Sequence, residues 1–159
     1  MIKVGIIGCG FVGGALKNWL ENNNPECKLF ISDPPKGYND DLSGIDIAFL
    51  QIHVPTEEDG SQDLTLMKQL IKNLPDVPVF VRTTILPGTS AMLTKETGHN
   101  GYYMPEFLTE RTFIEDFNKQ TMVFTGAQDL LTKIFVGKKF TVMSPLEAEL
   151  TKYMHNVFG

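Results

Sequence analysis

The sequence contains few of the residues that build disulfide frameworks and metal centres. Its 159 residues include two cysteines and three histidines, and they show neither a CxxC pair nor a Cys/His spacing typical of zinc. We therefore expect no metal site, and we interpret His53, His99 and His155 as structural or surface residues. The isolated Cys9 and Cys27 argue against a disulfide-rich secreted fold and favour a reducing, cytoplasmic setting.

Long hydrophobic segments and an excess of positive charge are also lacking. Apolar runs long enough to cross a bilayer do not occur, so the sequence predicts no membrane span. Met1 leads straight into a short apolar segment, without the charged and long hydrophobic parts of a signal peptide. The formal net charge is −5, and this charge argues against nucleic acid as a partner.

Strand and helix patterns alternate along the chain and predict an α/β fold with a mostly parallel sheet. The length of 159 residues suits one domain. Strands are expected at residues 2–7, 27–32, 45–54, 77–81 and 101–104, with further candidates at 122–125 and 140–143. Helices are expected at residues 11–20, 64–74 and 89–97, just after Pro105, and from Pro145 to the end.

A glycine-rich segment joins the first expected strand to the first expected helix. Gly8, Gly10 and Gly13 form a GxGxxG pattern, and this position makes it typical of a dinucleotide-binding turn. The first glycine permits the tight turn, the second lets a pyrophosphate approach the backbone, and the third lets helix and strand pack closely. Because the helix N-terminus offers N–H groups to phosphates, Phe11 and Val12 are also predicted cofactor contacts.

A carboxylate stands at the end of the second expected strand. Asp33 follows Gly13 by twenty residues, the position from which an acidic side chain hydrogen-bonds the adenosine ribose of NAD. A carboxylate there repels a 2′-phosphate, so the sequence predicts NAD rather than NADP. Lys36 weakens this preference, since its cation could take up phosphate charge, and we include it among the cofactor contacts. The alternative is a glycine-rich turn followed by an unrelated aspartate.

Several further segments resemble the N-terminal domain of the nucleotide-sugar dehydrogenases that act on UDP-glucose or GDP-mannose. They occur in the family's order and near its usual spacing, at residues 52–56 with 59–64, 82–89 (RTTILPGT, where the family has STVPPGT), 104–110 (MPEFLTE), 117–126 and 148–158. The PEFL segment and a lysine followed four residues later by an asparagine are specific. The resemblance implies a Rossmann-type doubly wound domain over residues 1–143, with the start of a connecting helix over residues 144–159.

The resemblance also assigns roles to individual residues. It implies that Thr84 and Glu106 orient the catalytic water, while Lys152 and Asn156 stabilise the charge on the reacting C6 oxygen. Further cofactor contacts are implied at Val54, Pro55, Thr56, Thr83 and Glu110, and a substrate site at Glu106, Phe107, Leu108, Lys152 and Asn156.

The spacing of these residues is compatible with such roles, although each has an ordinary alternative. Lys152 and Asn156 lie four residues apart, on one face of the expected last helix, where an ammonium and an amide can hold an oxyanion. If the segment after Pro105 is helical, Glu106 and Glu110 also share a face, and one of them could act as a base. Taken singly, charged pairs at this spacing are usually solvated, and an asparagine near a helix end can be a cap.

The sequence departs from the family in its cysteines. The family's second oxidation step passes through a thioester on a cysteine in a GGxCxxKD type of motif, which has no match here. Cys9 lies in the glycine loop and Cys27 begins a strand, so neither suits a nucleophile. Met104 and Arg111 stand where the family commonly has Asn and Gly, which leaves the identity of the sugar open.

Three functions are compatible with this sequence. The first is the NAD-binding half of a nucleotide-sugar 6-dehydrogenase, and the second is an NAD-binding module without turnover. The third is a β-hydroxyacid dehydrogenase-like enzyme, which also has Lys and Asn four apart and needs no cysteine. The last helix carries the apolar Leu150, Met154, Val157 and Phe158, and we expect this face to contact a second copy or a C-terminal domain that is missing here.

Overall fold

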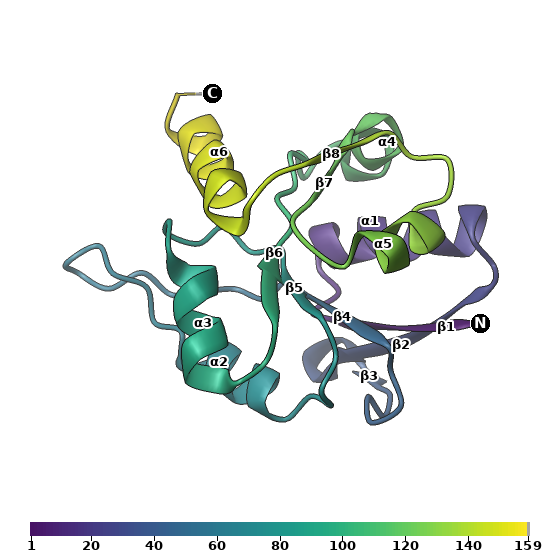
Figure 1. Cartoon of the computed structure of the whole chain (residues 1–159), viewed down its shortest axis with the longest axis horizontal. Helices are drawn as coiled ribbons and strands as arrows, with labels where there is room; N and C mark the ends of the chain where they lie inside the picture. The colour runs from purple at the N-terminus through teal and green to yellow at the C-terminus, as the bar shows by residue number, and fades with distance from the viewer. Residues whose placement is uncertain (159) are drawn as a thin grey trace.

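The computed structural model describes residues 1–158, and a six-stranded sheet forms its centre (Figure 1). The strands lie in the order β3-β2-β1-β4-β5-β6. All neighbours are parallel except β3, which runs antiparallel to β2. Their bounds are β1 (Ile2–Ile7), β2 (Cys27–Asp33), β3 (Tyr38–Asn39), β4 (Ile47–Leu50), β5 (Val79–Val81) and β6 (Gly101–Tyr103). The predicted mostly parallel α/β fold is confirmed.

Helices cover both faces of this sheet, as the continuous apolar strands require. One face packs against α1 (Phe11–Asn23), α4 (Phe113–Lys119) and α5 (Gln128–Ile134), and the other packs against α2 (Thr65–Lys72) and α3 (Thr89–Thr97). Along β5, Phe80 belongs to the first cluster, whereas Val79 and Val81 belong to the second. The last helix, α6 (Pro145–Phe158), packs beside α3 and β6.

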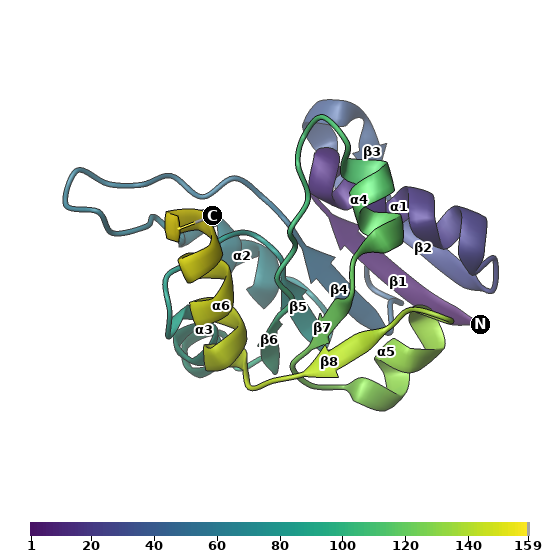
Figure 2. The same cartoon turned by 90° about the horizontal axis from the view of Figure 1, so that it is seen from above.

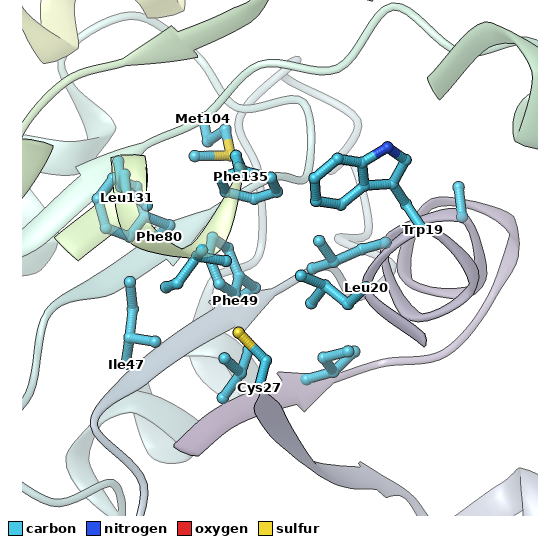
Figure 3. Packing of buried hydrophobic residues seen from close by; sticks show 14 of the residues in the cluster. Trp19, Leu20, Cys27, Ile47, Phe49, Phe80, Met104, Leu131 and Phe135 are labelled. Atoms are coloured by element: carbon cyan, nitrogen blue, oxygen red, sulfur yellow. The ribbon is translucent and has the colours of Figure 1, made fainter. Parts of the chain in front are cut away.

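Aromatic side chains fill the core beneath α1. Figure 3 shows Trp19, Phe49, Phe80 and Phe135 in this cluster. The ring centroid of Phe135 lies 5.7 Å from that of Trp19 on α1 and 5.8 Å from that of Phe49 on β4. Phe135 therefore connects α1 to the sheet. Cys27 lies among these packed side chains.

The order of the parallel strands reverses at β1, which has β2 on one side and β4 on the other. The loops that leave the carboxyl ends of these strands therefore run in opposite directions, which opens a crevice between them. In open α/β sheets this reversal is the usual place for a ligand. The glycine-rich loop between β1 and α1 lies at this point.

The expected strand at residues 45–54 is shorter than predicted, because it ends at Leu50. The reason lies in the next loop, where the Thr83 hydroxyl accepts from the N–H of Ile52 at 3.0 Å and donates to its carbonyl oxygen at 2.8 Å. This one side chain satisfies both polar groups of Ile52 and removes them from the ladder. The loop that follows extends away from the sheet before α2 (Figure 2).

The prediction of a helix directly after Pro105 is wrong, because α4 begins only at Phe113. The Glu106 side chain accepts a hydrogen bond from the N–H of Leu108 at 2.8 Å, a local contact that competes with helical pairing. Glu106 and Glu110 therefore do not share a helix face. The structure also adds a helix that the sequence analysis did not predict, α5.

The last two expected strands are present but do not join the central sheet. They are β7 (Met122–Phe124) and β8 (Phe140–Val142), which form a separate parallel pair. Among residues 1–158, the structure contains no helix that is both long and apolar enough to span a membrane.

Candidate dinucleotide site

Two clefts open side by side at the carboxyl edge of the sheet. One, of about 550 Å³, lies beyond β2 and is lined by Asp33, Lys36 and the two prolines between them, and we name it the β2 cleft. The other, of about 290 Å³, is lined by residues 82–84 and Glu106, and we name it the β5 cleft. They share four lining residues, Gly10, Gln51, Ile52 and His53. The clefts therefore meet over the glycine loop, as the two halves of a dinucleotide would require.

The three glycines of the loop differ in what a side chain at each position would contact. A Cβ at Gly8 would lie 2.1 Å from the Gln51 carbonyl oxygen, and the φ of Gly8 is +87°. A Cβ at Gly13 would lie 2.1 Å from the Gly8 carbonyl oxygen. A Cβ at Gly10 would have no neighbour within 4 Å. Backbone packing thus requires the first and third glycines, whereas the space above Gly10 is free for a ligand.

Asp33 and Lys36 bind the two main-chain polar groups of Cys9 in this loop. The Asp33 carboxylate accepts a hydrogen bond from the N–H of Cys9 at 2.7 Å, and the Lys36 ammonium donates to the Cys9 carbonyl oxygen at 3.1 Å. Both side chains also line the β2 cleft. Asp33 therefore lies at the end of β2 with its carboxylate beside the loop. This is the position expected for the acidic residue that hydrogen-bonds the adenosine ribose.

Apolar side chains form another wall of the β2 cleft. Leu66 and Leu70 of α2 line it together with Ile52, and Leu66 is 55% exposed. A flat aromatic ring could cover this apolar surface. The sequence motifs gave no indication of this wall, because α2 contains no part of the glycine pattern.

A buried ion pair stands at the β5 end of the site. The Lys152 ammonium donates to the main-chain oxygen of Glu106 at 2.6 Å and lies 3.3 Å from its carboxylate. Both side chains are nearly enclosed, with residue exposures of 5% for Lys152 and 7% for Glu106. Separating a buried ion pair leaves uncompensated charges and is strongly unfavourable. The contact therefore holds α6 against the loop after β6.

The other two predicted catalytic residues also meet. The Asn156 amide lies 3.4 Å from the Thr84 hydroxyl, on the exposed side of the site. The structure thus brings Thr84, Glu106, Lys152 and Asn156 together at the ends of β5, β6 and α6. Thr84 and Glu106 line the β5 cleft itself.

Glu149 explains why α6 lies where it does. Its carboxylate accepts hydrogen bonds from the main-chain N–H groups of Gly88 and Ser90, the latter at 2.9 Å, at the start of α3. Glu149 is 1% exposed, so a buried carboxylate is satisfied by a helix N-terminus. This contact places Lys152, one turn further along α6, beside Glu106.

Other predicted contacts lie outside the two clefts. Val54 is buried in the core, and Pro55 and Thr56 begin the extended loop, where the Pro55 carbonyl accepts from the N–H of Asp63 at 2.8 Å and Thr56 pairs with Gln62. Glu110 is exposed in a turn. The remaining predicted substrate contacts, Phe107 and Leu108, are half-buried beside Glu106, and the Phe107 ring lies 4.9 Å from the His155 ring.

The cleft residues that the sequence analysis missed as site residues include the polar Gln51, His53 and Arg82. Gln51 donates its amide N–H groups to the carbonyl oxygens of Ile7, Gly8 and Phe49 at 2.8–3.0 Å, while its buried Oε1 has no partner among the described residues. His53 was interpreted as structural or surface, but its exposed ring lines both clefts. Arg82 lines the β5 cleft and is 1% exposed. Only burial, which no motif encodes, distinguishes Gln51 and Arg82 from ordinary polar residues.

Neither cysteine is available to a substrate. Cys9 and Cys27 are both buried, and burial raises the pKa of each thiol. A raised pKa lowers the fraction of thiolate, the nucleophilic form. Within residues 1–158 the structure contains no group of three or more His, Cys, Asp or Glu side chains that could hold a metal ion.

Comparisons with known proteins agree with the motifs. No protein-family model matches the chain. It is 26% identical over 141 residues to a UDP-glucose 6-dehydrogenase of Rickettsia felis, a match that covers 76% of this chain and 32% of that protein. The chain therefore spans about a third of the length of the curated relatives it matches.

Solved structures show the same fold. A GDP-mannose dehydrogenase from Pseudomonas aeruginosa, solved as a ternary complex, matches with a TM-score of 0.73 and 20% identity, over 98% of this chain and 49% of the other. A 3-hydroxyisobutyrate dehydrogenase from Salmonella typhimurium matches with a TM-score of 0.62 and 15% identity, over 99% of this chain and 62% of the other. In sequence this chain is similar to about a third of the length of the UDP-glucose 6-dehydrogenases, and in fold to about half of a GDP-mannose dehydrogenase.

Proposed function

We propose that the chain is the NAD-binding part of a dehydrogenase that oxidises the C6 alcohol of a UDP- or GDP-sugar toward the uronic acid. One observation carries the proposal: two clefts meet over Gly10, with Asp33 in one and Glu106 in the other. Residues 1–143 would form the cofactor domain, and residues 144–159 would begin the connection to the rest of the enzyme.

The residues of the β2 cleft fit the adenosine half of NAD. Space above Gly10 and the N-terminus of α1 suit the pyrophosphate. Asp33 would accept the ribose hydroxyls, and the wall formed by Leu66 and Leu70 would cover the adenine. When bound, the nicotinamide supplies the hydride acceptor.

The residues at the other end fit the oxidation of an alcohol. An alcohol that loses hydride must also lose a proton, and the Lys152 ammonium can stabilise the negative oxygen that forms. The Glu106 carboxylate, already held by Lys152 and by the Leu108 N–H, can accept a proton or orient a water. Thr84 would orient that water together with Glu106, and Asn156 would hold the negative oxygen together with Lys152. The Thr84 and Asn156 side chains meet on the exposed side of the site. Phe107 and Leu108 would contact the sugar nucleotide.

Calorimetric titration of the purified chain with NAD and with NADP tests the cofactor assignment. We expect NAD to bind more tightly, because the Asp33 carboxylate repels the 2′-phosphate of NADP. Equal affinities, or no binding of either dinucleotide, would contradict the proposal. The substrate is tested by adding UDP-glucose or GDP-mannose to the NAD-saturated chain and measuring a second binding event.

A second candidate is a β-hydroxyacid dehydrogenase-like enzyme. It is favoured by the fold shared with 3-hydroxyisobutyrate dehydrogenase and by the absence of an accessible thiol among the described residues. Reduction of NAD in the presence of 3-hydroxyisobutyrate, but not of UDP-glucose, would select this candidate.

We further propose that the outer face of α6 contacts another part of the assembled enzyme. Leu150, Met154, Val157 and Phe158 are 44–77% exposed on this helix. Adjacent exposed apolar side chains on a terminal helix are typical of a contact surface. A second copy and a C-terminal domain are the two occupants that the proposal allows.

A further inference from the structure

Arg82 is a buried cation that lacks a partner. It directly follows β5, where its main-chain N–H donates to the Leu50 carbonyl oxygen at 2.8 Å. Its side chain is 1% exposed, and its three guanidinium nitrogens have no hydrogen-bond partner among residues 1–158. The guanidinium carbon lies 5.7 Å from the centroid of the Phe117 ring. Arginine normally satisfies its five N–H donors when it is buried.

The side chain keeps its charge under physiological conditions. Burial lowers the pKa of Arg82 to about 10, and the Glu106 carboxylate opposes this shift. At neutral pH the guanidinium therefore remains protonated and positive. Burying a protonated guanidinium without a hydrogen-bond partner costs free energy in the ligand-free protein. We therefore expect the partner of Arg82 to be supplied by a bound ligand.

The carboxylate that acts on the charge of Arg82 is already engaged. Glu106 is bound by Lys152 and by the N–H of Leu108. Tyr103, the other titratable group beside Arg82, has a raised pKa because it is buried, so its phenol is neutral. Among the described residues, neither Glu106 nor Tyr103 forms a hydrogen bond with the Arg82 guanidinium.

Arg82 shares its cleft with a second feature that attracts anions. Gly10 to Gly13, the N-terminus of the 13-residue helix α1, line the same β5 cleft as Arg82. A helix N-terminus carries partial positive charge and free N–H groups. The β5 cleft thus has a guanidinium group and a helix N-terminus in its lining. Together they suit the oxygens of a phosphate or a carboxylate.

We propose that Arg82 binds an oxyanion group of a ligand in the β5 cleft, beside the N-terminus of α1. The oxyanion comes from one of two sources: the pyrophosphate of the dinucleotide, or an acidic group carried by the substrate. The two sources rest on the proposed function, whereas the anion site itself is argued only from Arg82 and the β5 cleft. The related motif has serine at this position, so the anion contact distinguishes this chain from the family pattern.

Three variants separate this role from a structural one. Arg82→Met removes the charge and keeps most of the side-chain length, whereas Arg82→Lys keeps a charge without the planar fork. Lys95→Met is the matched control, because Lys95 is exposed at the end of α3 that lies away from the clefts. Each variant and the parent chain are titrated with sodium pyrophosphate, with NAD, and with glucuronate in the presence of NAD, and their melting temperatures are measured.

The expected result combines stability with affinity. Arg82→Met melts at the same or a higher temperature than the parent, because it loses an unpaired buried charge, yet it binds one class of probe on the order of 10- to 100-fold more weakly. Weaker binding of pyrophosphate and NAD identifies the cofactor as the source, and weaker binding of glucuronate alone identifies the substrate. Arg82→Lys loses less affinity, and Lys95→Met loses none.

The proposal is overturned if Arg82→Met binds every probe as tightly as the parent, or if the parent binds none of them. If Arg82→Met fails to fold, Arg82→Lys decides, since a folded Lys variant with unchanged affinity for all probes also overturns it. Binding of pyrophosphate that depends on Arg82, without any binding of NAD, would refute the proposed function and leave the oxyanion site intact.

Discussion

The Lys152 ammonium lies 2.6 Å from the main-chain oxygen of Glu106, although the two residues are 46 positions apart in the chain. This contact joins α6 to the loop after β6, where Glu106 lines the β5 cleft. Since it is nearly enclosed, it affects both the stability of the fold and the chemistry of the site.

Replacing Lys152 by methionine should destabilise the protein. The change leaves the Glu106 carboxylate buried with only the Leu108 N–H as a partner, and breaking a buried pair in this way costs about 3 kcal/mol or more. Urea unfolding followed by circular dichroism measures the loss. The matched control is Lys68→Met, which breaks a pair with Glu96 whose side chains are 31% and 43% exposed and should cost less than about 1 kcal/mol. Equal losses in the two variants would contradict the assignment of a buried pair.

Adding Glu106→Gln to Lys152→Met should recover part of that stability, because the second change removes the uncompensated carboxylate. The double variant is therefore expected to unfold at a higher urea concentration than Lys152→Met. If the two changes simply add, the side chains are not coupled, and the ion pair does not hold α6 in place.

Alanine in the glycine loop should separate folding from binding. At Gly10 a methyl group meets no neighbour within 4 Å, so Gly10→Ala should keep its melting temperature while it blocks the approach of a pyrophosphate. At Gly13 the methyl group meets the Gly8 carbonyl oxygen at 2.1 Å, so Gly13→Ala should lower the melting temperature. Thermal melts and NAD titration of both variants test this. Gly14→Ala is the control, because its methyl group would only touch the Phe113 ring at 4.0 Å.

Asp33→Ala should weaken NAD binding by about 1–3 kcal/mol, the usual effect of losing hydrogen bonds to a charged group. Asp46→Ala is the matched control, because Asp46 also accepts one main-chain N–H, from Lys3 at 2.8 Å, but lies before β4 at the opposite edge of the sheet. Calorimetry with NAD compares the two variants. Equal affinity in the parent and in Asp33→Ala would remove Asp33 from the ribose site.

Much of the fold was predictable, because its signals are local. The range predicted for α3, residues 89–97, matches the structure, in which Gly98 in the left-handed region follows the helix. The two-residue strand β3 and the helix α5 were not predicted. A two-residue strand has no periodicity to detect, and α5 begins after Ala127, a non-glycine residue with a φ of +47°, which sequence patterns do not indicate.

The site was predictable where motifs name residues and unpredictable where packing decides. Gly10, Asp33 and Thr84 follow from spacing and resemblance, and all three line the clefts. In the sequence Arg82 only begins the segment at residues 82–89, at a position where the family has serine. Its burial, with the Phe117 ring of α4 5.7 Å from the guanidinium carbon, depends on tertiary contacts that no local pattern contains.

Both thiols should react slowly in the folded chain. Burial raises the pKa of Cys9 and of Cys27 above the ordinary thiol value, so at pH 8 each is less ionised than free cysteine, and its rate should continue to rise as the pH increases beyond 9. Titration with Ellman's reagent should show labelling at least about tenfold slower than for free cysteine, followed by fast labelling in guanidinium. A thiol that reacts rapidly at pH 7 would identify a nucleophile that the structure does not indicate.

The 159-residue chain should bind NAD without forming a uronic acid. In a two-step oxidation of this type, a thiolate must reach the aldehyde carbon formed in the first step, and the only two cysteines of the sequence are buried in the glycine loop and the core. The intermediate must also be kept from water between the two hydride transfers, whereas the Thr84 and Asn156 side of the site is exposed. The test incubates the chain with NAD and UDP-glucose or GDP-mannose, follows NADH absorbance, and searches for the acid by mass spectrometry. A full-length UDP-glucose 6-dehydrogenase, such as that of Rickettsia felis, serves as the positive control. Steady NADH formation with acid product from this chain alone would contradict this prediction and would show that a route without these thiols operates.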